Sequence, residues 1–373
     1  MPTGRRDSIA FTVVVTVLVC LGALPILVIV ALSGAPGSMV LATGLAALPV
    51  GPLVAGYLWL DRYEPEPKRL LASGLLWGGF VATAAALILQ GIGGFVVGFT
   101  DEQTLAIVAP VTEEFSKGLF LVLLMWWRRG EFDGLLDGVV YAGMVGIGFA
   151  FIENILYLAA AYNGTDGMGP GGTEAVTTVF IVRCLFAPFA HPLFTTFTGI
   201  GVAIAIGSRR RGVRVAAPLL GYAFAVATHA AWNASTLSGV RSFAGVYLLL
   251  MVPAFITLTL LAIWWRTSER RMLAVALQDA SRRGLIPATD IEWLVDLEAR
   301  RRSRAFAREL GGKQAEQAMR DYQQAAIELG FLHHRFLRGT APADYVERGQ
   351  AYVDRINEIR PYVAFPGQVV PHR

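Results

Sequence analysis

Long apolar runs separated by short polar loops occupy about the first 266 residues of this 373-residue chain. A helix needs about 20 apolar residues to cross the hydrocarbon core of a bilayer, and eight runs of that size can be drawn. The pattern therefore predicts an all-α fold, a polytopic membrane helix bundle with about eight transmembrane helices. The runs lie near 9–32, 39–60, 70–92, 103–127, 135–161, 177–207, 215–236 and 243–265.

Beyond residue 266 the pattern changes to amphipathic helices of mixed charge. Thr289, with Glu292 three positions later, is typical of a capping box, and the amphipathic stretch that it opens ends near Gly311 and Gly312. Two further patterned stretches follow, around 313–337 and 342–359. We therefore expect two domains, a transmembrane domain at 1–266 and a helical tail at 267–373.

Charge separates the same two parts of the chain. The first 266 residues carry 29 Asp, Glu, Lys and Arg, about 11%, and the last 107 carry 31, about 29%. Soluble domains carry about 25%. The 54% hydrophobic content of the whole chain is therefore an average over a part that lies in lipid and a part that lies in water. This composition excludes a fully soluble enzyme, a disordered protein and a disulfide scaffold. The scattered basic residues form no nucleic-acid patch, so we expect no nucleic-acid partner.

Lys and Arg are concentrated in alternate loops. The N-terminus, the second, fourth and sixth loops and the exit of the last run hold 14 of them, and the intervening loops hold only Arg241. Cytoplasmic loops retain an excess of positive charge. We therefore expect a multi-pass protein of the cell membrane with both termini, and the tail, in the cytoplasm.

Apart from Asp137, which is predicted to lie at the cytoplasmic mouth of the fifth span, seven Asp, Glu, Lys, Arg and His residues lie within the apolar runs, where each costs at least about 2.5–3.5 kcal/mol. They occupy four consecutive predicted spans, and such groups persist only if they face one another. They are Glu113, Glu114 and Lys117 in the fourth span, Glu153 in the fifth, Arg183 and His191 in the sixth, and His229 in the seventh.

Spacing within each helix refines this prediction. Lys117 can pair with either Glu113 or Glu114, but adjacent side chains lie about 100° apart around a helix. The two carboxylates therefore point in different directions and cannot both contact the same reacting group. We interpret Lys117 and Arg183 as structural ion-pair partners. Prolines at 188 and 192 predict a kinked or opened sixth span beside His191, and the glycines at 138, 143, 146 and 148 predict close helix packing.

These residue types suit hydrolysis of an amide bond. A carboxylate can accept a proton from water, and a histidine or the amide of Asn233, which shares a helix face with His229, can stabilise an oxyanion. The same set can hold Zn²⁺, because His191, His229 and one of the adjacent glutamates, with Glu114 as the candidate, leave a position open for water. The sequence contains no HExxH pair. Both mechanisms, zinc-dependent and directly carboxylate-dependent, therefore stay open.

At these positions the sequence resembles a known family. The segment 113–117 (EEFSK) is similar to the EExxK motif of the PrsW family of intramembrane proteases, 149–153 (FAFIE) to its FxxxE motif, and 229–233 (HAAWN) to its HxxxN motif. His191 matches the family's additional histidine. The family is related to the CAAX prenyl endopeptidases and bacteriocin-processing enzymes. Each motif alone is weak, but the four in order, over about 100–236, are specific.

The resemblance implies a multi-span peptidase, dependent on glutamate or on a metal, that cuts membrane-anchored protein substrates. In some members the substrate is an anti-sigma factor. The expected catalytic residues are Glu113, Glu114, Glu153, His191, His229 and Asn233. Two alternatives are a proton-coupled transporter, which uses the same residue types, and a non-catalytic membrane scaffold. The sequence does not identify a partner for the tail.

Overall fold

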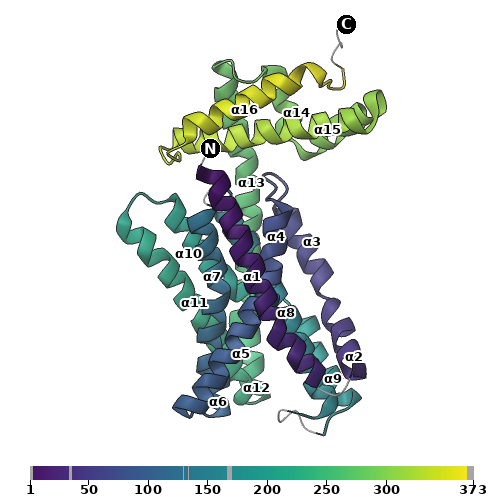
Figure 1. Cartoon of the computed structure of the whole chain (residues 1–373), viewed down its shortest axis with the longest axis vertical. Coiled ribbons are helices and arrows are strands. Elements are labelled where there is room, and N and C mark those ends of the chain that lie inside the picture. Colours follow the sequence, from purple (N-terminus) through teal and green to yellow (C-terminus); the bar gives the residue numbers. More distant parts are fainter. Residues whose placement is uncertain (1–2, 33–35, 129, 133, 166–169, 368–373) are drawn as a thin grey trace. The chain divides into compact units, whose positions relative to one another are not determined.

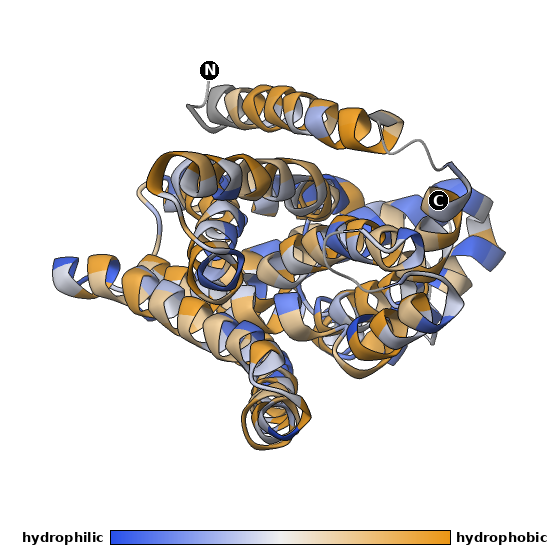
Figure 2. Ribbon diagram, turned by 90° about the horizontal axis from the view of Figure 1, so that it is seen from below, coloured by the Kyte–Doolittle hydropathy of each residue, from blue (hydrophilic) through white to orange (hydrophobic). Residues whose placement is uncertain are grey.

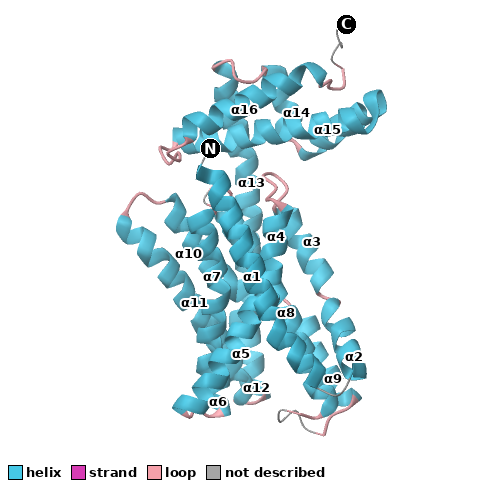
Figure 3. Cartoon of the chain, viewed as in Figure 1, coloured by secondary structure: helices cyan, strands magenta, loops and turns pink. Residues whose placement is uncertain are grey.

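Helices make up most of the protein, and the part of the chain that the structure describes contains no strand (Figure 3). The structure is a computed structural model, and it describes residues 3–32, 36–128, 130–132, 134–165 and 170–367. The all-α fold predicted from the hydrophobic pattern is therefore confirmed.

The chain forms two compact units, Met1–Asp61 with Glu66–Ala262, and Arg62–Pro65 with Ile263–Arg373. The first unit is a helix bundle whose elements are labelled in Figure 1. Its helices are α1 (Thr3–Leu32), α2 (Pro36–Ala47), α3 (Val50–Leu60), α4 (Lys68–Leu76), α5 (Thr83–Ile92), α6 (Asp101–Gln103), α7 (Ala109–Trp127), α8 (Leu135–Asn163), α9 (Thr173–Phe180), α10 (Ala190–Gly207), α11 (Arg211–Leu237), α12 (Val240–Val246) and the start of α13 (Val252–Arg282). Five π-helical turns continue these helices, η1 (Trp77–Ala82), η2 (Gly93–Val97), η3 (Thr104–Val108), η4 (Ile181–Phe186) and η5 (Tyr247–Met251).

Seven helical segments among the described residues are long and apolar enough to cross a membrane. They are Ile9–Ala31, Pro36–Leu60, Lys68–Val97, Leu135–Asn163, Thr173–Gly207, Arg211–Leu237 and Val240–Arg282. The eighth predicted span, 103–127, is helical as well, but three charged residues lower its hydropathy. Because this segment packs against α5, α8, α10 and α11, it lies inside the bundle, where its charges are shielded from lipid.

The outer surface of the bundle is apolar. On α1, which carries the N-terminal label in Figure 2, the apolar residues dominate the ribbon. Ile9, Val13, Leu21, Leu24 and Leu27 are each more than half exposed. A contiguous apolar surface of this size marks a site of contact with a membrane or with another protein. Together with the seven candidate spans, it indicates a multi-pass membrane protein.

Helix α8 runs through the centre of the bundle and is buried over most of its length. Glycines allow its neighbours to approach closely. A Cβ atom on Gly138 would lie 2.5 Å from the carbonyl oxygen of Gly199 on α10, and one on Gly148 would lie 1.9 Å from that of Leu75 on α4. Close packing at the glycine-rich run is therefore confirmed, and it brings the helices that carry Glu153 and His191 together.

The predicted sixth span is opened beside its histidine, as the prolines indicate. Helix α9 continues into η4, the chain leaves helical geometry at Ala187, and α10 begins at Ala190. His191 therefore lies in the first turn of α10, where it is less constrained by a preceding helical turn than it would be in mid-helix.

A group of buried carboxyl side chains lies in the first unit where α3 ends and where α4 and α8 begin. Asp61, Glu66 and Asp137 are each less than 9% exposed. The hydroxyl of Tyr141 donates to Glu66 at 2.5 Å, and the backbone N–H of Glu66 donates to Asp61 at 3.0 Å. Burial raises the pKa of Asp61 to about 8 and that of Glu66 well above its usual range.

Replacing Asp61 by asparagine should stabilise the protein, and more so at high pH. Folded Asp61 retains a proton that the unfolded chain releases near pH 4, so its contribution to stability falls as pH rises from about 4 to its folded pKa of about 8. Asparagine keeps an acceptor for the N–H of Glu66 and does not ionise. Thermal unfolding in detergent should show a larger gain for Asp61→Asn at pH 8 than at pH 5, and none for exposed Asp354→Asn. An equal gain at both pH values would contradict this explanation.

The second unit contains the end of α13, the 3₁₀ turns η6 (Ala288–Asp290) and η7 (Arg360–Tyr362), and the helices α14 (Ile291–Val295), α15 (Leu297–Leu337) and α16 (Tyr345–Ile359). These elements enclose an apolar core that includes Leu277, Leu294 and Phe365. Asp290 is fully buried, where it accepts from Tyr322 at 2.5 Å and from Arg360 at 2.6 and 2.9 Å. An apolar core and a satisfied polar group are typical of a folded helical unit.

One local prediction for this unit needs correction, and a second is confirmed. The capping box at Thr289 does not form, because a 3₁₀ turn covers that residue and α14 starts after Asp290 without a side-chain cap. The helix end predicted near Gly311 and Gly312 is confirmed, because both residues leave helical geometry and separate two helices within α15, the second of which ends at Leu337. Gly312 adopts a positive φ of 65°, which a glycine accepts without strain.

Candidate active site

Charged and polar side chains from α7, α8, η4, α10 and α11 meet inside the first unit. They include all six residues expected to be catalytic and both expected ion-pair partners. Glu114 and Lys117 are 0% exposed, and His229 is 1% exposed. Such burial is tolerated only when each charge has partners, and the contacts of these groups fall into three sets.

The first set surrounds Glu114. Its Oε1 atom accepts from Lys117 Nζ at 2.5 Å and lies 3.0 Å from His229 Nδ1, and its Oε2 accepts from the Thr195 hydroxyl at 3.3 Å. Because a carboxylate accepts here, Nδ1 of His229 carries the proton and Nε2 is left as a lone-pair donor. Glu114 therefore orients the His229 ring from behind, as carboxylates behind metal-binding histidines do.

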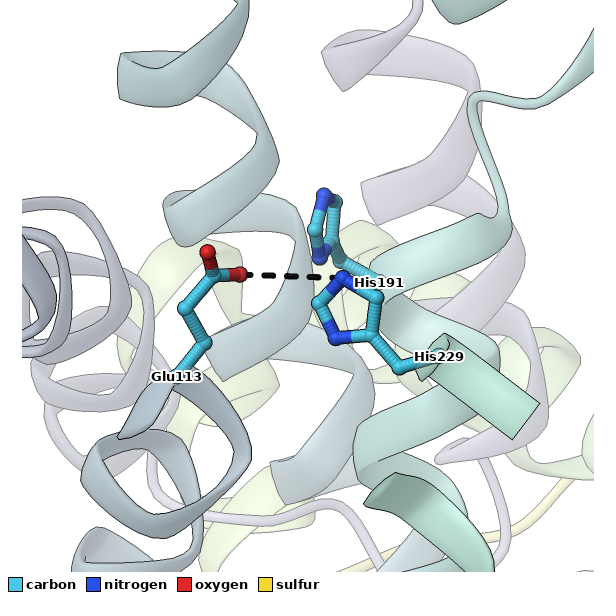
Figure 4. Close-up of side chains that lie close together, drawn as sticks. All are labelled: Glu113, His191 and His229. Atoms are coloured by element: carbon cyan, nitrogen blue, oxygen red, sulfur yellow. Dashed lines mark ion pairs between the residues drawn. The ribbon is translucent and has the colours of Figure 1, made fainter. Parts of the chain in front are cut away.

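The second set surrounds Glu113. The side-chain amide of Gln90 donates to its Oε1 at 3.3 Å. Its Oε2 is buried and has no hydrogen-bond partner among the described residues, and it lies 3.8 Å from Nε2 of His229 and 3.9 Å from Nζ of Lys117. One atom each of Glu113, His191 and His229 lie within 4.8 Å of one another (Figure 4).

The carboxylate placed so that it could bind a metal ion together with both histidines is Glu113, whereas the sequence predicted Glu114 as the candidate ligand. The physical reason is the angle of about 100° between adjacent side chains. That angle predicted that the two acids face different directions, but which one faces which partner depends on how α7 is rotated against α10 and α11.

The third set surrounds Glu153 on α8. Nε2 of His191 lies 2.6 Å from its Oε2, and the guanidinium of Arg183 donates to the same oxygen. Arg183 also donates to Asn154 at 2.8 Å. Lys117 lies 3.1 Å from Nδ1 of His191. An ammonium can only donate, so this contact assigns the proton of neutral His191 to Nε2, which then donates to Glu153.

Asn233 lies on α11 one turn after His229. Its side-chain amide donates to the carbonyl oxygen of Leu105 in η3 at 2.9 Å. An amide NH₂ has two donors, so this bond leaves a second N–H for a further acceptor. The sequence placed Asn233 beside the site through its spacing from His229 but did not indicate its partner.

A cavity of about 810 Å³ adjoins these residues. Gln90, Glu113, Phe149, Glu153 and Asn233 all line it, and so do Asp101 at the start of α6 and Thr165 after α8. Both of these last segments lie at the lower end of the bundle in Figure 1. The cavity therefore extends from the buried carboxylates toward the loops at that end. Sequence reasoning missed Gln90, whose one signal was an amide in an otherwise apolar run.

The fold and the site together define a class of protein, a polytopic helical membrane protein with a buried carboxylate–histidine centre. Residues 66–258, just over half of the chain, match the family model described as PrsW family intramembrane metalloprotease. The chain belongs to the PrsW family, which confirms the resemblance seen in the motifs and extends it on both sides of 100–236.

Curated relatives agree with this assignment. The chain is 32% identical to Protease PrsW of Geobacillus kaustophilus (strain HTA426) over 157 residues, which cover 41% of this chain and 62% of that protein. It is 30% identical to Protease PrsW of Bacillus subtilis (strain 168) over 122 residues, or 30% of this chain and 52% of the relative. The chain thus spans about half to three fifths of the length of these relatives. No solved structure matches it.

The family description implies a metal ion, and the residues fit one. Two imidazoles and a carboxylate are a donor set that zinc uses in hydrolases. Nε2 of His229 is a free lone-pair donor, and Oε2 of Glu113 is a buried oxygen without a hydrogen-bond partner in the described part of the chain. His191 would have to give up its contact with Glu153 before its Nε2 atom could bind a metal, because Nε2 donates its proton to that carboxylate.

Proposed function

We propose that this chain is an intramembrane endopeptidase that hydrolyses peptide bonds of membrane-anchored protein substrates. The observation that carries the proposal is the meeting of Glu113, Glu153, His191 and His229 beside a cavity large enough for a peptide segment. Membership of a family of intramembrane metalloproteases favours this function over a proton-coupled transporter or a scaffold.

The side chains have distinct roles in the proposed reaction. Oε2 of Glu113 accepts a proton from the attacking water, because it is a buried carboxylate oxygen without a hydrogen-bond partner among the described residues. His229, oriented by Glu114, holds its Nε2 toward the same point. The free N–H of Asn233 stabilises the developing oxyanion, and Glu153 with His191 can pass a proton to the leaving amine. In the alternative, zinc-dependent mechanism, Glu113 and the two histidines would hold a zinc ion, which would supply Lewis acidity to polarise the scissile carbonyl, and Glu113 would then be a ligand and not the proton acceptor.

The proposal extends to the arrangement in the membrane. The distribution of Lys and Arg supports a cell-membrane location with both termini and the 267–373 tail in the cytoplasm. With that orientation, Asp101 and Thr165 lie on the extracytoplasmic side, so the cavity opens to water there. Substrates would then be cut toward their outer side, and a membrane-anchored anti-sigma factor is one substrate of the right class.

The function is tested by comparing new protein N-termini in cells that express the wild type or Glu113→Gln at equal levels. A genuine substrate is a single-span membrane protein that gains an N-terminus only with the wild type. That protein, tagged at both ends, then becomes the reporter for purified enzyme. Identical sets of N-termini in the two strains would overturn the proposal.

Purified protein should contain about one zinc ion per chain. We expect His229→Ala to lose this zinc, because Nε2 of His229 is free to bind a metal. His333→Ala, in the second unit, should retain it, because His333 contacts Asp279 and Tyr345 instead. Elemental analysis after detergent purification measures the content. A wild type that carries no divalent metal, yet cleaves the reporter in the presence of a chelator, would favour the direct carboxylate mechanism.

A further inference from the structure

The two oxygens of Glu113 have different surroundings. Oε1 accepts a hydrogen bond from Gln90, while Oε2 has no hydrogen-bond partner among the described residues and faces His229. A carboxylate can rotate about its last torsion, which is broad and roughly two-fold. A contact with a neighbouring side chain must therefore determine which oxygen of Glu113 faces the histidines, and in which orientation.

Lys117 competes for this carboxylate. Its ammonium lies 3.9 Å from Oε2 of Glu113, at the i,i+4 spacing that favours ion pairs on a helix. A rotation of the Glu113 side chain that shortens this ion pair would change the position of Oε2 relative to Nε2 of His229. In the structure Lys117 is instead held by Glu114 at 2.5 Å and by His191 at 3.1 Å.

Gln90 opposes that rotation from the other side. It is the one amide in the 70–97 segment, which is otherwise composed of apolar and small residues. Its helix, α5, packs against α7, and its side chain is half-buried at the wall of the cavity. A polar side chain in an apolar span is costly unless it has a partner, and the partner of Gln90 is Glu113 itself.

We propose that Gln90 is a positioning residue for Glu113. By holding Oε1, its amide directs Oε2 toward His229 and keeps the ion pair of Glu113 with Lys117 as long as 3.9 Å. The expected effect of Gln90 on kcat rests on the proposed function. Its expected effect on the orientation of Glu113, and so on metal binding, does not depend on which substrate is cut.

The test compares the full-length wild type with Gln90→Met and Gln90→Leu, which keep an apolar side chain of similar size but remove the donor. Ile88→Met on the same helix is the matched control, because Ile88 is exposed and has no role in the site. Elution from a sizing column in detergent selects the variants that fold.

Two measurements decide the question. With Zn²⁺ alone as the probe, the Gln90 variants should bind about 10 to 100 times more weakly than the wild type, the usual effect of removing a partner of a metal ligand. On the tagged reporter, kcat should fall by a similar factor while KM changes less than about two-fold. Ile88→Met should match the wild type in both measurements.

Two results would overturn the inference. One is a folded Gln90→Met protein with wild-type Zn²⁺ affinity and wild-type kcat. The other is an increase in KM at constant kcat, which would make Gln90 a substrate contact. If the wild type cuts no single-span protein, the proposed function fails, and the Zn²⁺ comparison still decides the role of Gln90.

Discussion

Glu113→Gln is expected to lower kcat for cleavage of the tagged reporter by about 10²–10⁴-fold, the usual contribution of a general base. Glutamine has nearly the same shape, but its amide neither accepts a proton from water nor binds a metal as a carboxylate does. The change removes a buried charge whose Oε2 has no hydrogen-bond partner in the described part of the chain. Folding and membrane insertion should therefore stay normal.

Exposed Glu298→Gln in the second unit is the matched control for Glu113→Gln. Among the described residues, the Glu298 side chain pairs with Arg301 at the surface of the second unit, so this variant should cleave like the wild type. Turnover is measured with purified protein at equal concentration, by gel separation of the doubly tagged reporter. Cleavage by Glu113→Gln at the wild-type rate would remove Glu113 from the mechanism.

Lys117→Met is expected to have the largest effect on stability, a loss of about 3–5 kcal/mol. Lys117 is fully buried and lies against Glu114, His191 and the Phe149 ring, whose centroid is 4.2 Å from Nζ. Removing one member of a buried ion pair leaves the other as an uncompensated charge. Glu114, which is also fully buried, would keep only His229 and Thr195 as partners.

The double variant Lys117→Met with Glu114→Gln separates this cause from simple loss of packing. Neutralising both partners removes the buried charge, so the double variant should be more stable than Lys117→Met alone. Lys313→Met, at an exposed position in the second unit, should leave stability unchanged. Thermal unfolding in detergent gives the comparison. A double variant less stable than Lys117→Met would indicate that the ion pair is not the source of the loss.

Much of the site was predictable because membrane helices make polar residues conspicuous. Glu113, Glu114, Lys117, Glu153 and His229 stand out in runs of apolar residues, and their energetic cost already required that they meet. The prolines around His191 likewise predicted the break before α10. These features can be predicted from the sequence of a single helix, because they depend only on that helix and on the lipid around it.

The parts that could not be predicted depend on several helices at once. Gln90 and Glu113 are 23 positions apart, and only the packing of α5 on α7 brings them to 3.3 Å. The capping box at Thr289 failed for a related reason. Asp290, the next residue, is fixed by Tyr322 and Arg360 from distant parts of the second unit, and these contacts override the local preference of the backbone.

By itself, the sequence determined the all-α membrane fold, the family and the set of side chains at the centre, because hydrophobic length, charge cost and motif order are properties of the linear chain. Only the tertiary structure decided which glutamate lies in one cluster with both histidines, which ring nitrogen of each histidine faces a carboxylate, and which amide contacts Glu113. Those choices depend on how each helix is rotated against its neighbours. That rotation is set by how side chains and glycines of neighbouring helices pack together, and this packing cannot be derived from the sequence of one helix.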